Sequence, residues 1–190
     1  NMPVSPRANM EWILRLCKDF VGSFGKSGIK NLYFHGAPGL GKTFLSACIA
    51  RAVSEQGRSV VYDTAGNIFA QFEDRKFFRG GDNQEARDET RRYLNCDLLI
   101  LDDFGMERQT EYALEQVFNV IDARYRSGKP LIITTNLSLT ELNAPKTLEH
   151  KRIYDRIKEM CQPLNFGSNG RRTERAQEKM RVAAELLRGD

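Results

Sequence analysis

The chain has 190 residues, of which 41% are hydrophobic and 28% are charged, a composition typical of one globular domain with a single core. No stretch approaches the ~18 consecutive apolar residues of a membrane span, and the first residues lack the pattern of a secretory signal. Four cysteines without metal-ligand spacing favour a cytoplasmic protein with reduced thiols, and a net charge of +4 permits contact with a polyanion without requiring it.

The first half of the chain alternates between helix and strand patterns. Apolar residues at helical spacing predict a helix over residues 9–24, and the short apolar run 31–35, which ends in glycines, predicts a buried strand. A second helix is predicted from Lys42 to the next glycine, followed by a strand over 59–62. Thr64 is a suitable N-cap for the helix that comes next.

The second half continues this alternation. The highly charged segment 73–92 is expected to contain a loop and a polar helix, and the apolar run 97–102 is the strongest strand pattern in the chain. The remaining predicted elements are a helical stripe over 114–125, a strand over 131–135, a helix over 147–160, a strand over 164–166 and a charged helix from Thr173. Because strands alternate with helices, we predict an α/β fold with a parallel sheet covered on both faces.

The predicted strand over 31–35 leads into the pattern G-x-x-x-x-G-K-T, which is the signature of a phosphate-binding loop between a strand and a helix. Glycines let successive N–H groups point at phosphate oxygens, and the start of the next helix adds its positive dipole end. Such a match arises by chance in roughly 1% of chains of this length. We therefore predict that ATP binds here with Mg²⁺. The predicted binding residues are Gly36, Ala37, Pro38, Gly39, Leu40, Gly41, Lys42, Thr43 and Phe44.

Two carboxylates, Asp102 and Asp103, follow one another at the end of the strongest predicted strand. Side chains alternate along a strand, so the two are expected to point in different directions. Asp102 would hold the hydration shell of Mg²⁺, and Asp103 would orient or deprotonate the attacking water. Ligands collect at the carboxyl ends of parallel strands, which places the pair beside the phosphate loop. The alternative is a solvated strand end before the turn at Gly105.

Polar residues farther along the chain have two interpretations each. Asn136 ends the next strand, where it can hydrogen-bond the γ-phosphate or the attacking water, or simply form a turn. Arg152 and Arg156 share a helix face, from which an arginine can reach the γ-phosphate of a neighbouring subunit, although solvated helix faces are the commoner use. Arg171 and Arg172 follow a glycine-containing turn and are either a second phosphate sensor or a helix start.

These motifs together resemble the AAA+ ATPases, specifically the DnaC-type helicase loaders, to which the IstB-type transposition ATPases are closely related. The resemblance rests on segments 31–43, 96–105, 132–137, 152–157 and 166–171. It implies a three-layer P-loop fold with a central parallel sheet, flanking helices and little or no separate lid domain. The expected organisation is an N-terminal helix and linker at 1–30, an ATPase core at 31–172, a charged C-terminal helix at 173–190 and a missing N-terminal helicase-binding region, as in a fragment.

The resemblance also implies a role for each matching residue. Asp103 stands where a glutamate is common elsewhere in AAA+ proteins. The implied roles are Lys42 for the phosphates, Thr43 and Asp102 for the metal, Asp103 for the attacking water, Asn136 as the first sensor, Arg156 as the finger that acts on a neighbouring subunit, and Arg171 as the second sensor.

The function implied by the resemblance is an ATPase that self-associates through Arg156, loads a replicative ring helicase and binds single-stranded DNA. Segment 75–79, Arg-Lys-Phe-Phe-Arg, combines charge with aromatic rings as single-strand grooves do, although a helix end with two core phenylalanines explains it more simply. Two other functions fit the motifs. One is a transposition accessory ATPase that binds duplex DNA, and the other is a small-molecule kinase whose lid would be segment 73–92.

Overall fold

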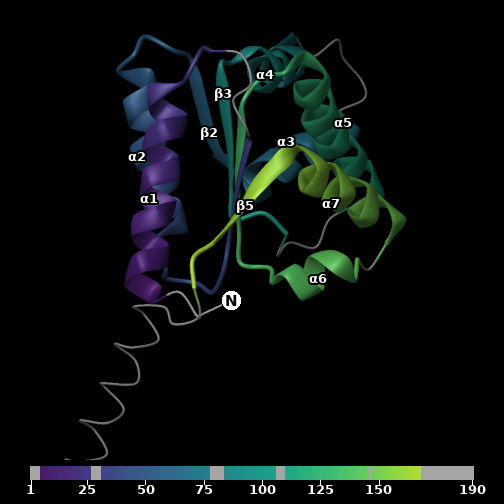
Figure 1. Ribbon diagram of the computed structural model, residues 1–190. Coiled ribbons are helices and arrows are strands. Elements are labelled where there is room, and N and C mark those ends of the chain that lie inside the picture. The colour runs from purple at the N-terminus through teal and green to yellow at the C-terminus, as the bar shows by residue number, and fades with distance from the viewer. Residues whose placement is uncertain (1–4, 27–30, 78–83, 106–109, 146, 168–190) are drawn as a thin grey trace, which may run out of the picture.

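The computed structural model describes residues 5–26, 31–77, 84–105, 110–145 and 147–167. Within these residues, a parallel sheet is sandwiched between helices (Figure 1), which confirms the predicted three-layer α/β fold. Its strands run in the order β2-β3-β4-β1-β5. Their bounds are Asn31–His35 for β1, Val60–Thr64 for β2, Leu98–Asp102 for β3, Leu131–Thr135 for β4 and Cys161–Asn165 for β5.

Helices cover both faces of the sheet. In Figure 1, α1 and α2 lie on one side, and α3, α4, α5 and α7 lie on the other. The helices are α1 (Pro6–Gly22), α2 (Lys42–Ser54), α3 (Ala65–Phe77), α4 (Gln84–Asn95), α5 (Glu111–Ser127), α6 (Leu139–Asn143) and α7 (Leu148–Met160). Among the described residues, no helix has the length and apolar character required to cross a membrane.

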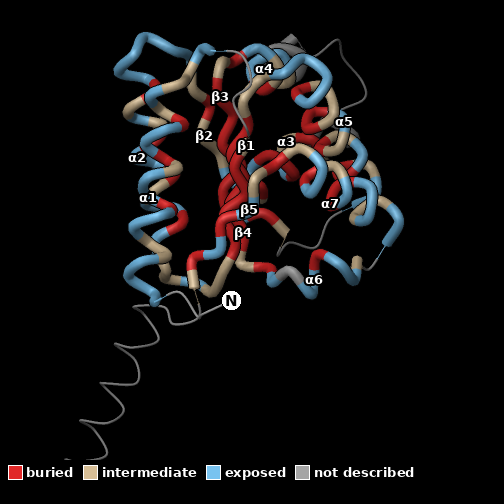
Figure 2. Tube along the Cα trace, in the orientation of Figure 1, coloured by how far each residue is buried: buried red, intermediate tan, exposed pale blue. Residues whose placement is uncertain are grey.

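The central strands are buried on both faces, as Figure 2 shows by the concentration of buried residues along them. On β3, Leu98 and Ile100 pack in the cluster that includes α1 and α2. Leu99 and Leu101 pack in the opposite cluster, which includes α3, α5 and α7. This division follows from the two-residue repeat of a strand, and it explains why the run 97–102 is apolar at successive positions.

The first helix begins earlier than the periodicity predicts. Ser5 accepts a hydrogen bond from the backbone N–H of Ala8, and Pro6 occupies the first helical turn, so capping chemistry starts α1 before its first buried residue, Ile13. Cys17 and Phe20 of this helix are buried in the same cluster as residues of α2 and of the sheet. The N-terminal helix is thus packed onto the core.

The last strand differs most from the prediction. β5 spans Cys161–Asn165 instead of 164–166, and its first residue is also the C-cap of α7. Pro163 argues against a strand in a central position, but β5 pairs with β1 alone, at the edge of the sheet, where a residue without an N–H is tolerated. The short helix α6 was not predicted. The expected helix from Thr173 lies outside the described residues.

Candidate nucleotide-binding site

The loop after β1 has the backbone conformation that its glycines allow. Gly36, Gly39 and Gly41 have φ values of 141°, 81° and 96°, which side chains rarely permit. Gly41 is the N-cap of α2 and provides no side-chain cap, so the first N–H groups of that helix remain available to an anion. This geometry suits the phosphates of a nucleotide.

Lys42 lies at the centre of the loop and is only 6% exposed. Its Nζ donates to the carbonyl oxygens of Gly36 at 2.6 Å and Ala37 at 2.9 Å, and to Oδ1 of Asn136 at 2.8 Å. Burial lowers the pKa of Lys42, while Asp103 and Asp102 act in the opposite direction. The ammonium group is therefore held by neutral acceptors that phosphate oxygens can replace.

Asp102 ends β3, is buried, and lies beside the first turn of α2. Its Oδ1 accepts hydrogen bonds from Oγ1 of Thr43 at 3.2 Å and from Oγ1 of Thr134 at 2.6 Å. A hydroxyl and a carboxylate are hard oxygen ligands of the kind that Mg²⁺ takes together with water and substrate phosphates. The described residues contain no group of three or more His, Cys, Asp or Glu side chains able to hold a metal.

The carboxylate of Asp103 has a different partner from that of Asp102, but strand alternation is not the reason. β3 ends at Asp102, and Asp103 has a left-handed backbone with φ of 55°, the only positive φ among described non-glycine residues. Its backbone N–H donates to Oγ1 of Thr134 at 2.9 Å. Its carboxylate accepts from Nδ2 of Asn136 at 2.6 Å. Asp103 is exposed, and its carboxylate is held by the side chain of Asn136.

Asn136 connects the two charged groups of the site. Its oxygen faces the ammonium group of Lys42, and its NH₂ faces the carboxylate of Asp103. The two charges dictate this orientation of the amide, because a cation needs an acceptor and a carboxylate needs a donor. The sequence allowed two interpretations of Asn136, a phosphate sensor or a turn residue. In the structure, Asn136 lies between Lys42 of the phosphate loop and Asp103, the second residue of the acidic pair.

Other residues of the site were not predicted from the sequence. Thr134 binds both acidic residues, although threonines in a strand give no distinctive signal. Tyr62 on β2 has its hydroxyl 3.1 Å from Oγ of Ser46, and burial raises its pKa to about 12. His35, at the end of β1, has a pKa lowered by burial and by the positive charge of Lys42, and both effects favour the neutral ring. The only feature of the sequence that could have pointed to His35 as a site residue was its position at the end of a predicted strand, directly before the glycine loop.

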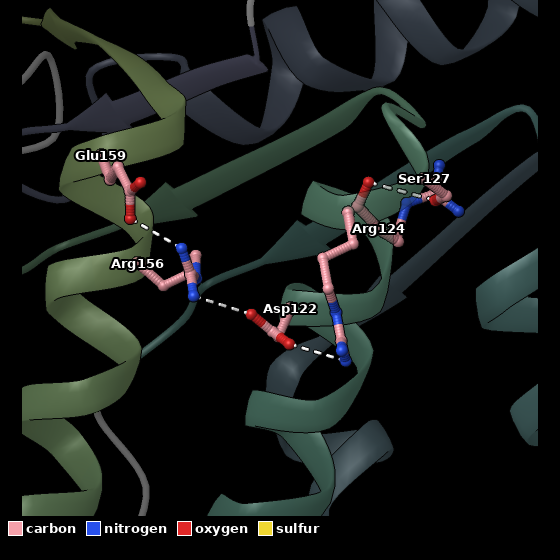
Figure 3. Close-up of polar contacts among 6 residues, drawn as sticks. Asp122, Arg124, Ser127, Arg156 and Glu159 are labelled. Carbon is pink, nitrogen blue, oxygen red and sulfur yellow. Dashed lines mark hydrogen bonds and ion pairs between the residues drawn. The ribbon is translucent and has the colours of Figure 1, made fainter.

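The predicted arginine finger lies elsewhere, on the outer helices. Arg156 of α7 pairs with Asp122 of α5 at 2.8 Å and with Glu159 at 2.7 Å, as Figure 3 shows. Its guanidinium also lies over the ring of Tyr125, 4.3 Å from the centroid. Asp122 has a second partner, Arg126, at 2.8 Å. Arg156 is therefore held by groups of its own chain.

The other candidates are placed as follows. Arg152 is exposed and lies over the ring of Phe118, 4.5 Å from the centroid. Phe44 lies in the first turn of α2 and is 74% exposed. Arg171 and Arg172 lie outside the described residues, as do the side chains of segment 75–79.

A comparison with protein families finds a match over most of the chain. The model for the IstB-like ATP binding protein family matches residues 20–179. The chain belongs to this family. IstB-like membership and the parallel sheet confirm the AAA+ P-loop fold and the DnaC-type resemblance that the motifs predicted.

Relatives of this IstB-like chain include proteins of Escherichia coli K12. The uncharacterized protein YdaV is 30% identical over 131 residues, which are 69% of this chain and 50% of YdaV. The replicative helicase loader DnaC is 28% identical over 145 residues, which are 76% of this chain and 56% of DnaC. The chain spans about half the length of the curated relatives it matches.

Solved structures of similar fold include a DnaC helicase loader, with a TM-score of 0.68 and 27% identity, covering 83% of this chain and 89% of that one. The replication initiator DnaA bound to AMPPCP and single-stranded DNA has a TM-score of 0.71 and 17% identity, covering 89% of this chain and 51% of that one. At this identity, the DnaA structure supports the fold alone.

Proposed function

We propose that this IstB-like protein hydrolyses ATP and couples its nucleotide state to single-stranded DNA and to the loading of a replicative ring helicase in the cytoplasm. The observation that carries the ATPase proposal is the hydrogen-bonded chain from Lys42 through Asn136 to Asp103, beside the Thr43–Asp102 pair. The DNA and helicase parts rest on the named relatives, the DnaC helicase loaders.

In the proposed mechanism, the phosphates of ATP lie in the glycine loop against the first N–H groups of α2. Lys42 exchanges its carbonyl partners for the β- and γ-phosphate oxygens. Thr43 and Asp102 would hold Mg²⁺, which supplies positive charge that neutralises the phosphates. Asp103 accepts a proton from the attacking water or orients it. Asn136 lies where it can contact both the γ-phosphate and that water, so it would report the presence of the γ-phosphate to Asp103.

Arg156 is proposed to complete the site of a neighbouring subunit. It lies on α7, which packs against α5, and its partner there is Asp122. A guanidinium brought to the γ-phosphate from outside stabilises the charge of the transition state. An isolated subunit would then be a weak ATPase, and turnover would depend on assembly.

The decisive experiment is ATP turnover as a function of protein concentration, with and without single-stranded DNA. We expect turnover per subunit to rise with concentration and ATP to increase single-strand affinity in a salt-sensitive manner. Lys42→Ala removes the phosphate contact and is expected to abolish ATP binding. Absence of ATP binding by the unaltered protein would refute the proposed function.

A transposition accessory ATPase is the second candidate, and the IstB-like description of the matching family favours it. The phosphate loop and acidic pair would work in the same way, but the DNA partner would be a duplex. Competition between labelled single-stranded and duplex DNA of the same sequence separates the two functions. Tighter ATP-dependent binding of the duplex would select transposition over helicase loading.

A further inference from the structure

Thr134, the fourth residue of β4, is 1% exposed and contacts both acidic residues of the site through one hydroxyl. Its Oγ1 donates to Oδ1 of Asp102 at 2.6 Å and accepts from the backbone N–H of Asp103 at 2.9 Å. A hydroxyl has one hydrogen and two acceptor sites, so it can serve both partners at once. The carboxylate can only accept and the N–H can only donate, which fixes the direction of both bonds.

The first bond holds the carboxylate of Asp102. The same Oδ1 also accepts from Thr43, but that bond is longer, at 3.2 Å, and Thr43 is exposed. If Thr43 turned its hydroxyl towards a metal, the buried hydroxyl of Thr134 would still donate to Oδ1. That bond would keep the carboxylate of Asp102 in one orientation about the Cβ–Cγ bond while a metal binds.

The second bond holds Asp103 in a conformation that its side chain disfavours. The φ of 55° places Asp103 in the left-handed region, and its N–H is directed at Thr134. The next residue is held to the same strand end, since the N–H of Phe104 donates to the carbonyl of Thr134 at 2.8 Å and its carbonyl accepts from Thr135. The turn that presents Asp103 is therefore attached to β4.

We propose that Thr134 is a positioning residue that fixes the metal-facing carboxylate Asp102 and the water-facing carboxylate Asp103 relative to each other. This inference rests on the proposed function, in which the two carboxylates serve Mg²⁺ and the attacking water. Thr134 touches neither substrate nor metal. It acts through its single hydroxyl, so loss of the hydroxyl disturbs both Mg²⁺ binding at Asp102 and the placement of the attacking water by Asp103.

Two substitutions separate the hydroxyl from the shape of the side chain. Thr134→Val keeps the shape and removes the hydroxyl, whereas Thr134→Ser keeps the hydroxyl and removes the methyl group. For the valine variant we expect an increase of about tenfold in the Mg²⁺ concentration for half-maximal ATP binding, and at least a tenfold lower kcat, because a hydrogen bond to a charged group is lost. ATP binding without Mg²⁺ is expected to stay unchanged, since the loop and Lys42 are untouched.

A measurement on the protein without nucleotide tests the contact itself. Amide hydrogen exchange at Asp103 is expected to be slow in the unaltered protein and in Thr134→Ser, and at least tenfold faster in Thr134→Val. Thr134→Ala serves if the valine variant does not fold, and the same results are expected of it. Melting curves ensure that all variants are compared while folded.

Three results would overturn the proposal. They are an unchanged Mg²⁺ requirement in a folded valine or alanine variant, unchanged exchange at the Asp103 amide, and failure of the serine variant to restore both. If the unaltered protein bound no ATP, the proposed function would fail instead, and the exchange of the Asp103 amide would still show whether Thr134 holds the turn.

Discussion

In the proposed function, Arg156 must leave Asp122 before it can reach a neighbouring subunit, so Asp122→Asn is expected to ease that movement. The pair is partly buried, with side-chain exposures of 24% for Arg156 and 13% for Asp122, and its atoms are 2.8 Å apart. Asparagine keeps the shape and one acceptor oxygen of the aspartate but removes its charge. The substitution thus weakens the intramolecular hold on Arg156 without leaving a cavity.

The size of the effect follows from this geometry. Exposed ion pairs contribute up to about 1 kcal/mol, and this pair is more sheltered, so the loss of charge is estimated at about 1 kcal/mol. That corresponds to roughly a fivefold change in an equilibrium constant. We therefore expect half-maximal ATP turnover at a protein concentration about fivefold lower in Asp122→Asn. The free energy of unfolding of the monomer is expected to fall by about 1 kcal/mol.

The assay is ATP turnover across a dilution series, paired with chemical denaturation at a concentration where the protein is monomeric. Arg126→Ala is the matched control, because Arg126 pairs with the other oxygen of Asp122, is 72% exposed on its side chain, and leaves Arg156 bonded. Turnover in Asp122→Asn that requires the same or a higher protein concentration would refute the competition between Asp122 and a neighbour's phosphate. Unchanged turnover of assembled Arg156→Ala would remove the finger role itself.

Three further predictions concern the site and its supports. Asp103→Asn is expected to keep ATP binding while slowing turnover about a hundredfold or more, in contrast to Lys42→Ala, and equal loss of binding in both would contradict the assigned roles. Gly105→Ala places a Cβ 2.4 Å from Cδ1 of Leu137 at a φ of +103°, so we expect a loss of about 2–3 kcal/mol in urea denaturation. Gly128→Ala, at a φ of +66° with open space around it, is the control and is expected to cost about 1 kcal/mol; equal losses would contradict the clash. Because burial lowers the pKa of Lys42, its phosphate-binding charge is lost at a lower pH than in an ordinary lysine, and ATP affinity is expected to fall about tenfold per pH unit above that lowered pKa. A loss of affinity that begins only at the pKa of an ordinary lysine would argue against this.

The phosphate loop and the strands were predictable because their signals are local. Gly36 and Gly41 are needed for backbone conformations that lie within one short segment, and the apolar run of β3 reflects burial on both faces. The short helix α6 was missed although Ser138 and Glu141 form a capping box, because a five-residue helix contains too few residues for a periodic pattern. The start of β5 was missed because its tolerance of Pro163 depends on its edge position.

The amino-acid sequence by itself determined the loop, the acidic pair and the alternation of strands with helices, since each depends on neighbours along the chain. Only the tertiary structure decided which side chains from other strands contact the residues of the phosphate loop. It placed Asn136 between Lys42 and Asp103, and it placed Thr134 against the carboxylate of Asp102 and the backbone N–H of Asp103, because strands distant in sequence end at one edge of the sheet. It also gave Arg156 its partner on α5, a contact between residues whose spacing in the sequence carries no pattern.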